Sequence, residues 1–436
     1  MGYLKHKFMV ADISKFITEN IRKYLVGSGQ DFTFRRADSD SIQFTRLEEI
    51  GLYVHIPFCK SLCPYCPYCR IPYDKKLASE YLEALLKEID LYKIKVGKVE
   101  ISSIYIGGGT PTNLIDELGT VLKRIREVFF ITGDIGIETS PYDVDDKVVK
   151  KLKDYGINLL SLGVQSFQDR FLKMLGRNYS SYDAYKAVET TTSANFDSVN
   201  FDFMFDLPGQ TVNDVIFDLK EAIARGVKQV TVYPLFTFSY SLAGERQALN
   251  GVQMPGIFRR KSFFYAIYDF LLKEGFERVS VWGFKKGPSK RFSSVTRNYY
   301  IGLGAGAGSR LPNVFYFNTF SVREYLKTLR DGFLPIALMM DISESLSRYY
   351  WFYWQGYNTY FSSKELKEVF KEDKKILKIF RILEMKGFFT HVEDNVSLTK
   401  KGTFWVHLIQ NYFILNYIDK VWLVCMKEAW PEEIKI

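Results

Sequence analysis

Short apolar strands alternate with helical segments between residues 51 and 283, and this alternation constrains the fold more than any other feature. The expected strands are Leu52–Ile56, Ser103–Ile106, Ile135–Glu138, Leu159–Gly163, Val199–Phe205, Gln229–Tyr233 and Arg278–Trp282. The expected helices are Leu77–Lys95, Asp143–Tyr155, Tyr182–Thr192, Val212–Ala224 and Phe258–Glu274. Alternation at this spacing is typical of βα units and a parallel sheet, so we expect an α/β fold.

Several of the expected strands end in residues that are unusual inside a sheet. These residues are His55, Gly107–Gly109, Glu138, Gln165 and Asp202. In α/β barrels the carboxyl ends of the parallel strands carry the chemistry. We therefore expect the functional site at this end of the sheet.

The sequence outside this region differs in pattern. Residues 1–47 are expected to form an N-terminal extension that contains one helix-like segment, Ser14–Tyr24. After a Gly-rich stretch at Gly302–Gly308, two helices and a hairpin between Ser362 and Leu398 outline a winged helix. We expect three parts: the extension (1–47), a barrel with its Gly-rich segment (48–340) and a small α+β accessory domain (341–436). We interpret the last as a packing domain rather than a nucleic-acid-binding one.

Composition narrows the class of protein. Four of the five cysteines lie within Cys59–Cys69, which excludes a disulfide framework spread along a secreted chain. The first residues, Met1–Ile13, lack the apolar run of a signal peptide, and no apolar stretch is long enough for a membrane span. We therefore expect a cytoplasmic protein. The net charge of +9 suits an anionic partner, but no Lys/Arg block indicates nucleic acid.

The strongest chemical signal is the loop that contains Cys59, Cys63 and Cys66. Three thiolates from one loop can bind one iron–sulfur cluster and leave one iron free for another ligand, here the amino and carboxylate groups of S-adenosylmethionine (SAM). The rival hypothesis is a zinc site that adds Cys69, although zinc sites usually take their second cysteine pair from well downstream. Cys69 is expected to be a spectator, with a fourth ligand or a substrate-facing thiol as alternatives. Cys425 is expected to be a buried structural thiol.

These residues resemble the radical SAM superfamily, in its oxygen-independent coproporphyrinogen III oxidase-like branch. The cluster segment Tyr53–Cys59 is similar to the branch motif Tyr-x-His-Ile-Pro-Phe-Cys. Further motifs similar to those of the branch are Tyr105–Thr112, Glu138–Pro141, Gly163–Phe167, Leu175–Arg177, Asn200–Thr211, Ile301–Ser309 and Leu398–Gly402. The resemblance covers residues 50–410 and implies a partial (β/α)6 barrel.

The resemblance also implies roles for individual residues. It assigns Cys59, Cys63 and Cys66 to a [4Fe–4S] cluster. The residues that it assigns to SAM are Tyr65, Gly108, Gly109, Thr110, Glu138, Gln165, Arg177 and Asp202. Glycine would let backbone approach the methionine amino group, Arg177 could clamp the carboxylate and Asp202 could accept from the ribose hydroxyls. The candidate catalytic residues are Tyr53 and Asp206, the latter an acid where the branch usually has glycine.

Two departures affect the expected reaction: Asp206 itself, and the two residues that separate Cys66 from Cys69 where the oxidases have one. We expect methyl or methylene transfer from a second SAM, bound near Gly304 and Gly306, to an sp2 carbon of an anionic, small-molecule or lipid-like substrate. The alternatives are oxidative decarboxylation of a tetrapyrrole, a haem chaperone, and a binding module based on the winged helix. The expected electron donor is a flavodoxin or ferredoxin.

Overall fold

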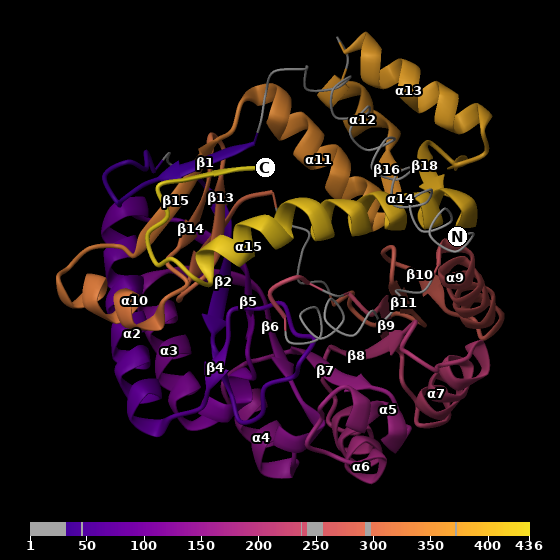
Figure 1. The fold of residues 1–436 in the computed structure, drawn as a ribbon, viewed down its shortest axis with the longest axis horizontal. Helices are drawn as coiled ribbons and strands as arrows, with labels where there is room; N and C mark the ends of the chain where they lie inside the picture. Colours follow the sequence, from indigo (N-terminus) through magenta and orange to yellow (C-terminus); the bar gives the residue numbers. More distant parts are fainter. Residues whose placement is uncertain (1–31, 45–46, 237, 242–255, 293–297, 371–372) are drawn as a thin grey trace, which may run out of the picture.

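A sheet with fourteen strands organises the computed structural model, which describes residues 32–436 apart from 45–46, 237, 242–255, 293–297 and 371–372 (Figure 1). Its parallel run consists of β2 (Glu49–Ile56), β5 (Glu100–Gly108), β6 (Phe130–Thr139), β7 (Leu159–Gln165), β8 (Ser198–Phe205) and β9 (Gln229–Pro234). These six strands are neighbours in chain order and pair in parallel. The expected partial (β/α)6 barrel is confirmed.

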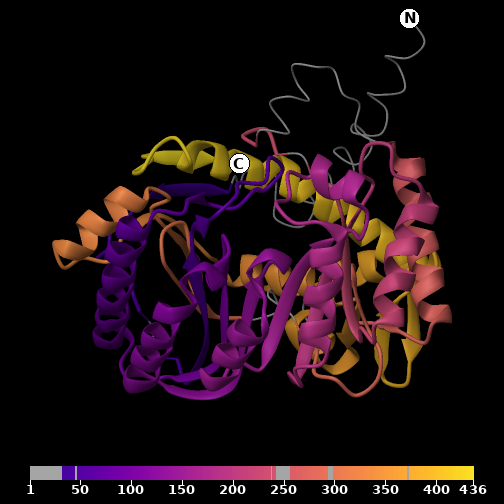
Figure 2. The ribbon, with the colours of Figure 1, turned by 90° about the horizontal axis from the view of Figure 1, so that it is seen from below.

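Helices follow the strands and cover the outside of the barrel (Figure 2). They are α2 (Lys75–Val96), α3 (Ile115–Val128), α4 (Asp146–Asp154), α5 (Asp169–Met174), α6 (Ser181–Thr192), α7 (Val212–Ala224) and α9 (Ile257–Lys273). Capping boxes at Ser180 and Thr211 satisfy backbone N–H groups at the starts of α6 and α7, which explains where these helices begin.

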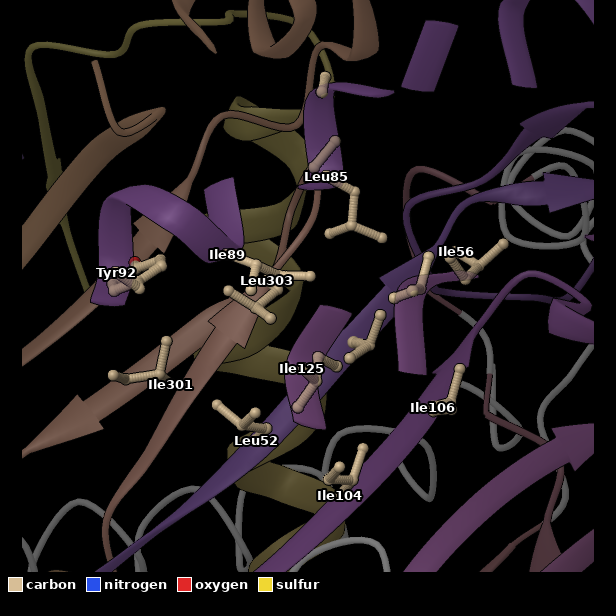
Figure 3. Close-up of a cluster of buried hydrophobic side chains, with 14 of the residues drawn as sticks. Leu52, Ile56, Leu85, Ile89, Tyr92, Ile104, Ile106, Ile125, Ile301 and Leu303 are labelled. Atoms are coloured by element: carbon tan, nitrogen blue, oxygen red, sulfur yellow. The ribbon is translucent and has the colours of Figure 1, made fainter. Parts of the chain in front are cut away.

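Apolar side chains between the sheet and the helices form the largest core cluster (Figure 3). Leu52, Ile104 and Ile301 from three neighbouring strands pack with Ile89 of α2 and Ile125 of α3. All five are at most 2% exposed. Burying one side chain of this size stabilises the folded state by about 1.5–3 kcal/mol. The cluster therefore holds the strands firmly against the helices.

The expected strand Arg278–Trp282 is wrong. The structure has two short antiparallel strands here, β10 (Glu277–Arg278) and β11 (Gly283–Lys285). A tight turn separates them, in which Gly283 N–H donates to Ser280 Oγ and Val279 N–H donates to Gly283 O. The chain therefore reverses before a longer strand can form.

The other half of the sheet extends the barrel. It contains β12 (Tyr300–Leu303), β13 (Gly308–Leu311), β14 (Val314–Asn318), β15 (Ile336–Asp341), β1 (Thr33–Arg36) and β19 (Glu433–Lys435), with α10 (Val322–Arg330) between β14 and β15. Only β12 continues the parallel run, by pairing with β2. Strand β1, from the expected extension, pairs with β15 and with β19. The boundaries at residues 47 and 340 stay a prediction, as does the helix-like segment Ser14–Tyr24, which lies outside the described residues.

The C-terminal part has the expected winged-helix-like outline. Its elements are α11 (Glu344–Asn358), β16 (Tyr360–Ser362), α12 (Ser363–Phe370), α13 (Lys374–Met385), β17 (Phe389–Val392) and β18 (Asn395–Leu398). The three strands form a separate antiparallel sheet. The chain then returns across the barrel as α14 (Lys400–Phe413), a π-helical turn η3 (Ile414–Ile418) and α15 (Asp419–Cys425) (Figure 1). No helix in the described part of the chain is long and apolar enough to cross a lipid bilayer.

Candidate active site

The carboxyl ends of the barrel strands open into a cavity of about 570 Å³. Most of the residues expected from the sequence line it. They are Cys59, Cys63, Tyr65, Cys66, Gly108, Gly109, Thr110, Glu138, Gln165, Arg177 and Asp202. Tyr53, Asp206, Gly304 and Gly306 are not among its lining residues.

The cysteine loop is closed by a short parallel pair of strands, β3 (Phe58–Cys59) and β4 (Ile71–Pro72). Backbone hydrogen bonds from Ile71 N–H to Pro57 O and from Tyr73 N–H to Cys59 O tie the two ends of the loop together. Inside the loop, Arg70 Nη2 donates to Cys63 O over 2.7 Å. These bonds hold the three cysteines at one side of the cavity.

The thiols of this loop lie in an environment that disfavours free thiolates. Burial, with a smaller contribution from Cys66, raises the pKa of Cys59 to about 12. Burial also raises the pKa of Cys66, which nearby Arg70 partly offsets. Thiolates at these positions therefore need a bound cationic centre.

The geometry of the loop bears on the choice between a zinc ion and a cluster. No three His, Cys, Asp or Glu side chains in the described residues come close enough together to hold one metal ion. A cubane distributes its thiolate ligands over separate irons, so it tolerates wider spacing than a single ion. The donor set of Cys59, Cys63 and Cys66 therefore fits a cluster better than a zinc site.

Cys69 points away from the cavity. It is 4% exposed and packs with Phe317, Phe320 and Cys425 in a separate hydrophobic cluster. Its Sγ donates to Phe320 O over 3.4 Å. This position gives no support to a fourth ligand or a substrate-facing thiol.

Glu138 connects two of the strand ends. Its carboxylate accepts hydrogen bonds from Tyr105 OH and, over 3.3 Å, from Gly108 N–H. Burial raises the pKa of this carboxyl. Gly108 has a φ of +112°, and a Cβ there would lie 2.7 Å from the His55 ring. Glycine, which was expected at position 108 for the close approach of SAM, is therefore also required for packing against the His55 ring.

Gln165 and Asp202 lie on the neighbouring strands β7 and β8. Gln165 has a φ of 67°, which is uncommon for a residue other than glycine and is typical of functional sites. Its Oε1 accepts from Tyr233 OH over 2.7 Å. Asp202 accepts from Ser161 Oγ and Asn200 Nδ2. Burial and the charge of Glu138 raise the pKa of Asp202 to about 7.

Arg177 lies between two tyrosines. Its guanidinium donates to Tyr65 OH and is 5.6 Å and 5.8 Å from the ring centres of Tyr65 and Tyr179. Among the described residues it forms no ion pair, and its Nε has no hydrogen-bond partner. A partly buried cation without an acidic partner is costly, so Arg177 is well suited to an anionic group such as the carboxylate of SAM.

The two expected catalytic residues lie outside the cavity lining. Tyr53 OH is hydrogen-bonded to His55 Nδ1 (2.7 Å), and His55 Nε2 to Cys69 O (2.7 Å), so the pair supports the cysteine loop from behind. Asp206 is fully buried and its two oxygens accept from Arg259 and Arg260 at 3.1 Å and 3.0 Å. Both oxygens of its carboxylate are engaged in ion pairs outside the cavity lining, and its expected catalytic role stays a prediction.

The expected second SAM site at Gly304 and Gly306 is also not supported. A Cβ on Gly304 would lie 2.5 Å from both His55 O and Tyr81 OH, and one on Gly306 would lie 3.0 Å from the Cβ of Cys69. Gly304 N–H donates to the buried Glu88. The protein's own atoms occupy the space that the prediction left for a ligand.

A second wall of the cavity was not predicted from the sequence. This wall is aromatic, and its rings come from segments far apart in the chain. It contains Phe236, Phe238, Trp282, Tyr353, Trp354, Tyr357 and Trp422, with Arg291 as a cation. In the sequence, only the aromatic content of 16% indicated such a wall, and composition does not show which residues form it.

Comparisons with known proteins agree with this site. A sequence profile of the Radical SAM superfamily matches residues 53–222. The Heme chaperone HemW of Lactococcus lactis is 31% identical over 281 residues, which cover 63% of this chain and 73% of the relative. The Oxygen-independent coproporphyrinogen III oxidase of Pseudomonas aeruginosa is 26% identical over 313 residues, 66% of this chain and 67% of the relative.

A solved structure has the same fold. Coproporphyrinogen III oxidase (HemN) from Escherichia coli superposes with a TM-score of 0.71 at 22% identity, over 86% of this chain and 92% of that one. The chain belongs to the radical SAM superfamily, in the branch that contains the oxygen-independent coproporphyrinogen III oxidases and the HemW proteins. Proteins of this superfamily use a [4Fe–4S] cluster and SAM, which are therefore the cofactors of this chain.

Proposed function

We propose that this chain is an enzyme that acts on a tetrapyrrole in the aromatic half of the cavity, by oxygen-independent oxidative decarboxylation of a carboxylate side chain. The observation that carries this proposal is that one cavity joins the cysteine loop to the aromatic wall. Pyrrole rings pack well against aromatic side chains, and Arg291 suits a carboxylate of such a substrate. The names of the relatives, a heme chaperone and a coproporphyrinogen oxidase, both refer to tetrapyrroles.

Residues of the strand wall would hold the cofactors. Cys59, Cys63 and Cys66 would bind the cluster, Arg177 would clamp the SAM carboxylate and Asp202 would accept from the ribose hydroxyls. When bound, the reduced cluster supplies the electron that breaks a carbon–sulfur bond of SAM and gives a carbon radical. The buried rings around Tyr65 and Tyr105 would keep water away from this chemistry.

Two partners follow from this proposal. A low-potential donor such as flavodoxin or ferredoxin would reduce the cluster, and an electron acceptor would take the electron left after CO2 is released. A cytoplasmic location suits both the oxygen-sensitive cluster and the free thiols. Methyl transfer from a second SAM is the weaker hypothesis, because the space near Gly304 and Gly306 is filled.

Product analysis tests the proposal. The protein, reconstituted with iron and sulfide without oxygen and then reduced, should form 5′-deoxyadenosine, CO2 and a vinyl product from coproporphyrinogen III, with no S-adenosylhomocysteine. Formation of S-adenosylhomocysteine would instead favour methyl transfer. Absence of substrate-dependent 5′-deoxyadenosine would contradict the decarboxylation.

A second candidate is a haem chaperone, which the similarity to HemW favours. It predicts stoichiometric haem binding that does not depend on SAM cleavage. A haem titration of the reconstituted protein, followed by absorbance, distinguishes it from the enzyme.

A further inference from the structure

The helical segment across the barrel contributes one side chain per turn to the cavity. Gln410, Ile414, Ile418 and Trp422 all line it, each four residues after the last. A turn of a continuous α-helix holds 3.6 residues, so side chains four residues apart would drift progressively away from one face of the helix. The π-helical turn η3 lies in the middle of this run. A π turn holds more residues than an α turn, so it offsets this drift and keeps the four side chains facing the cavity. Such π turns are frequent at functional sites.

Gln410 is the polar member of this row. It is 1% exposed, and neither Oε1 nor Nε2 has a hydrogen-bond partner among the described residues. Two other side chains of α14 each have one partner: His407 Nδ1 accepts from Trp282 Nε1, and Asn411 Oδ1 accepts from Arg260 Nη1, both over 3.0 Å. His407 Nε2 has no partner among the described residues, so Gln410 differs in that both of its polar atoms lack one. Both amide atoms of Gln410 lack a partner. The absence of hydrogen bonds therefore does not depend on which of the two atoms is assigned as the oxygen.

A buried amide without partners is unfavourable, so its presence in a cavity wall needs an explanation. Arg291 in the same cavity lining donates through Nη2 to Asn358 Oδ1, but its Nε also has no partner among the described residues. Together these two side chains offer N–H donors and one carbonyl acceptor, Gln410 Oε1. A matching ligand must therefore have carboxylates and also N–H groups of its own.

We propose that Gln410 is the residue that selects a metal-free, reduced tetrapyrrole over its iron complex. Its Oε1 accepts a hydrogen bond from a pyrrole N–H, while Arg291 donates to a carboxylate side chain, which the iron complex also carries. An iron complex has no such N–H, because the metal replaces the pyrrole protons. The described lining also contains no histidine, a common protein ligand of haem iron. This inference rests on the proposed function and specifies its substrate class.

Calorimetry under argon tests the inference on the full-length protein, reconstituted with its cluster and saturated with SAM. The two probes are coproporphyrinogen III and iron coproporphyrin III, which carry the same side chains. We expect the wild type to bind the porphyrinogen at least tenfold more tightly than the iron complex. Gln410→Met should weaken porphyrinogen binding about tenfold, the value of one hydrogen bond of about 1.4 kcal/mol. Its affinity for the iron complex should change less than twofold.

Two further variants separate recognition from folding. Gln410→Glu keeps an acceptor and should retain more porphyrinogen affinity than Gln410→Met. Gln410→Met removes the unpaired amide and should raise the melting temperature of the ligand-free protein. Lys401→Met, at an exposed position of the same helix, is the control and should change neither affinity.

The results distinguish the inference from the proposed function. If the wild type binds both rings equally, or Gln410→Met weakens both equally, the selection by Gln410 is wrong while tetrapyrrole binding stands. If the wild type binds neither ring, the proposed function itself fails.

Discussion

The two walls of the cavity differ in how they are built. The strand wall consists of polar side chains at consecutive strand ends, such as Glu138 and Asp202, and most of these have protein partners. The aromatic wall consists of rings from α11, α15 and loops, together with the amide of Gln410, which has no hydrogen-bond partner among the described residues. The polar side chains of the strand wall are therefore held by the barrel itself, whereas the amide of Gln410 has no such support among the described residues.

The largest effect should come from the cysteine loop of the strand wall. Changing Cys59, Cys63 or Cys66 to Ala should abolish the cluster, which should otherwise hold about four irons and four sulfides per chain. Cys69→Ala should retain it, because this thiol packs outside the cavity. Iron and sulfide analysis with EPR measures the outcome. Loss of the cluster in Cys69→Ala alone would return that thiol to the ligand set.

The next largest effect should fall on a residue that belongs to neither wall. Asp206→Ala removes the partner of two arginines in a buried site, so it should lower the free energy of unfolding by about 3–5 kcal/mol. Denaturant titration measures this change. Asp269→Ala breaks an exposed ion pair with Lys400 and serves as the control, with an expected cost of at most about 1 kcal/mol. A stable Asp206→Ala protein that has lost only its turnover would restore the catalytic hypothesis.

Arg177 and Trp354 provide a direct contrast between the walls. Arg177→Ala should weaken SAM binding by about 2–3 kcal/mol, since it removes a charge-assisted pair. Trp354→Ala should weaken tetrapyrrole binding by about 1 kcal/mol and leave SAM binding unchanged. Calorimetry with each ligand measures both. Equal effects of either variant on both ligands would show that the two walls do not act separately.

The smallest effect should be a pH dependence of SAM affinity. The pKa of Asp202 is raised to about 7, mainly by burial, so this group gains its negative charge as the pH rises through 7. Because the ionised form accepts from ribose hydroxyls better, SAM should bind about tenfold more tightly at pH 8 than at pH 6. Asp202→Asn should remove this dependence. The same slope in Asp202→Asn would assign it to another group.

The sequence predicted the strand wall because its information is local. Strand ends such as Glu138 and Asp202 follow directly from the βα alternation, and the spacing of Cys59, Cys63 and Cys66 lies within one loop. The aromatic wall could not be predicted in this way, because Trp282, Trp354 and Gln410 meet only when the C-terminal helices dock across the barrel. For Gly304 and Gly306 the sequence is ambiguous, since close packing by the protein and close approach of a ligand both require glycine. Asp206 is ambiguous for a related reason: a buried acid beside a motif can also serve structure alone.

We propose that SAM and a tetrapyrrole occupy the strand wall and the aromatic wall of one cavity. Transfer of deuterium from the propionate side chains of labelled coproporphyrinogen III into 5′-deoxyadenosine, measured by mass spectrometry, tests it most directly. A single turnover of the reduced, reconstituted protein should place one deuterium in 5′-deoxyadenosine. Cleavage of SAM in the presence of the labelled ring without any deuterium transfer would rule out hydrogen abstraction from a tetrapyrrole bound in this cavity.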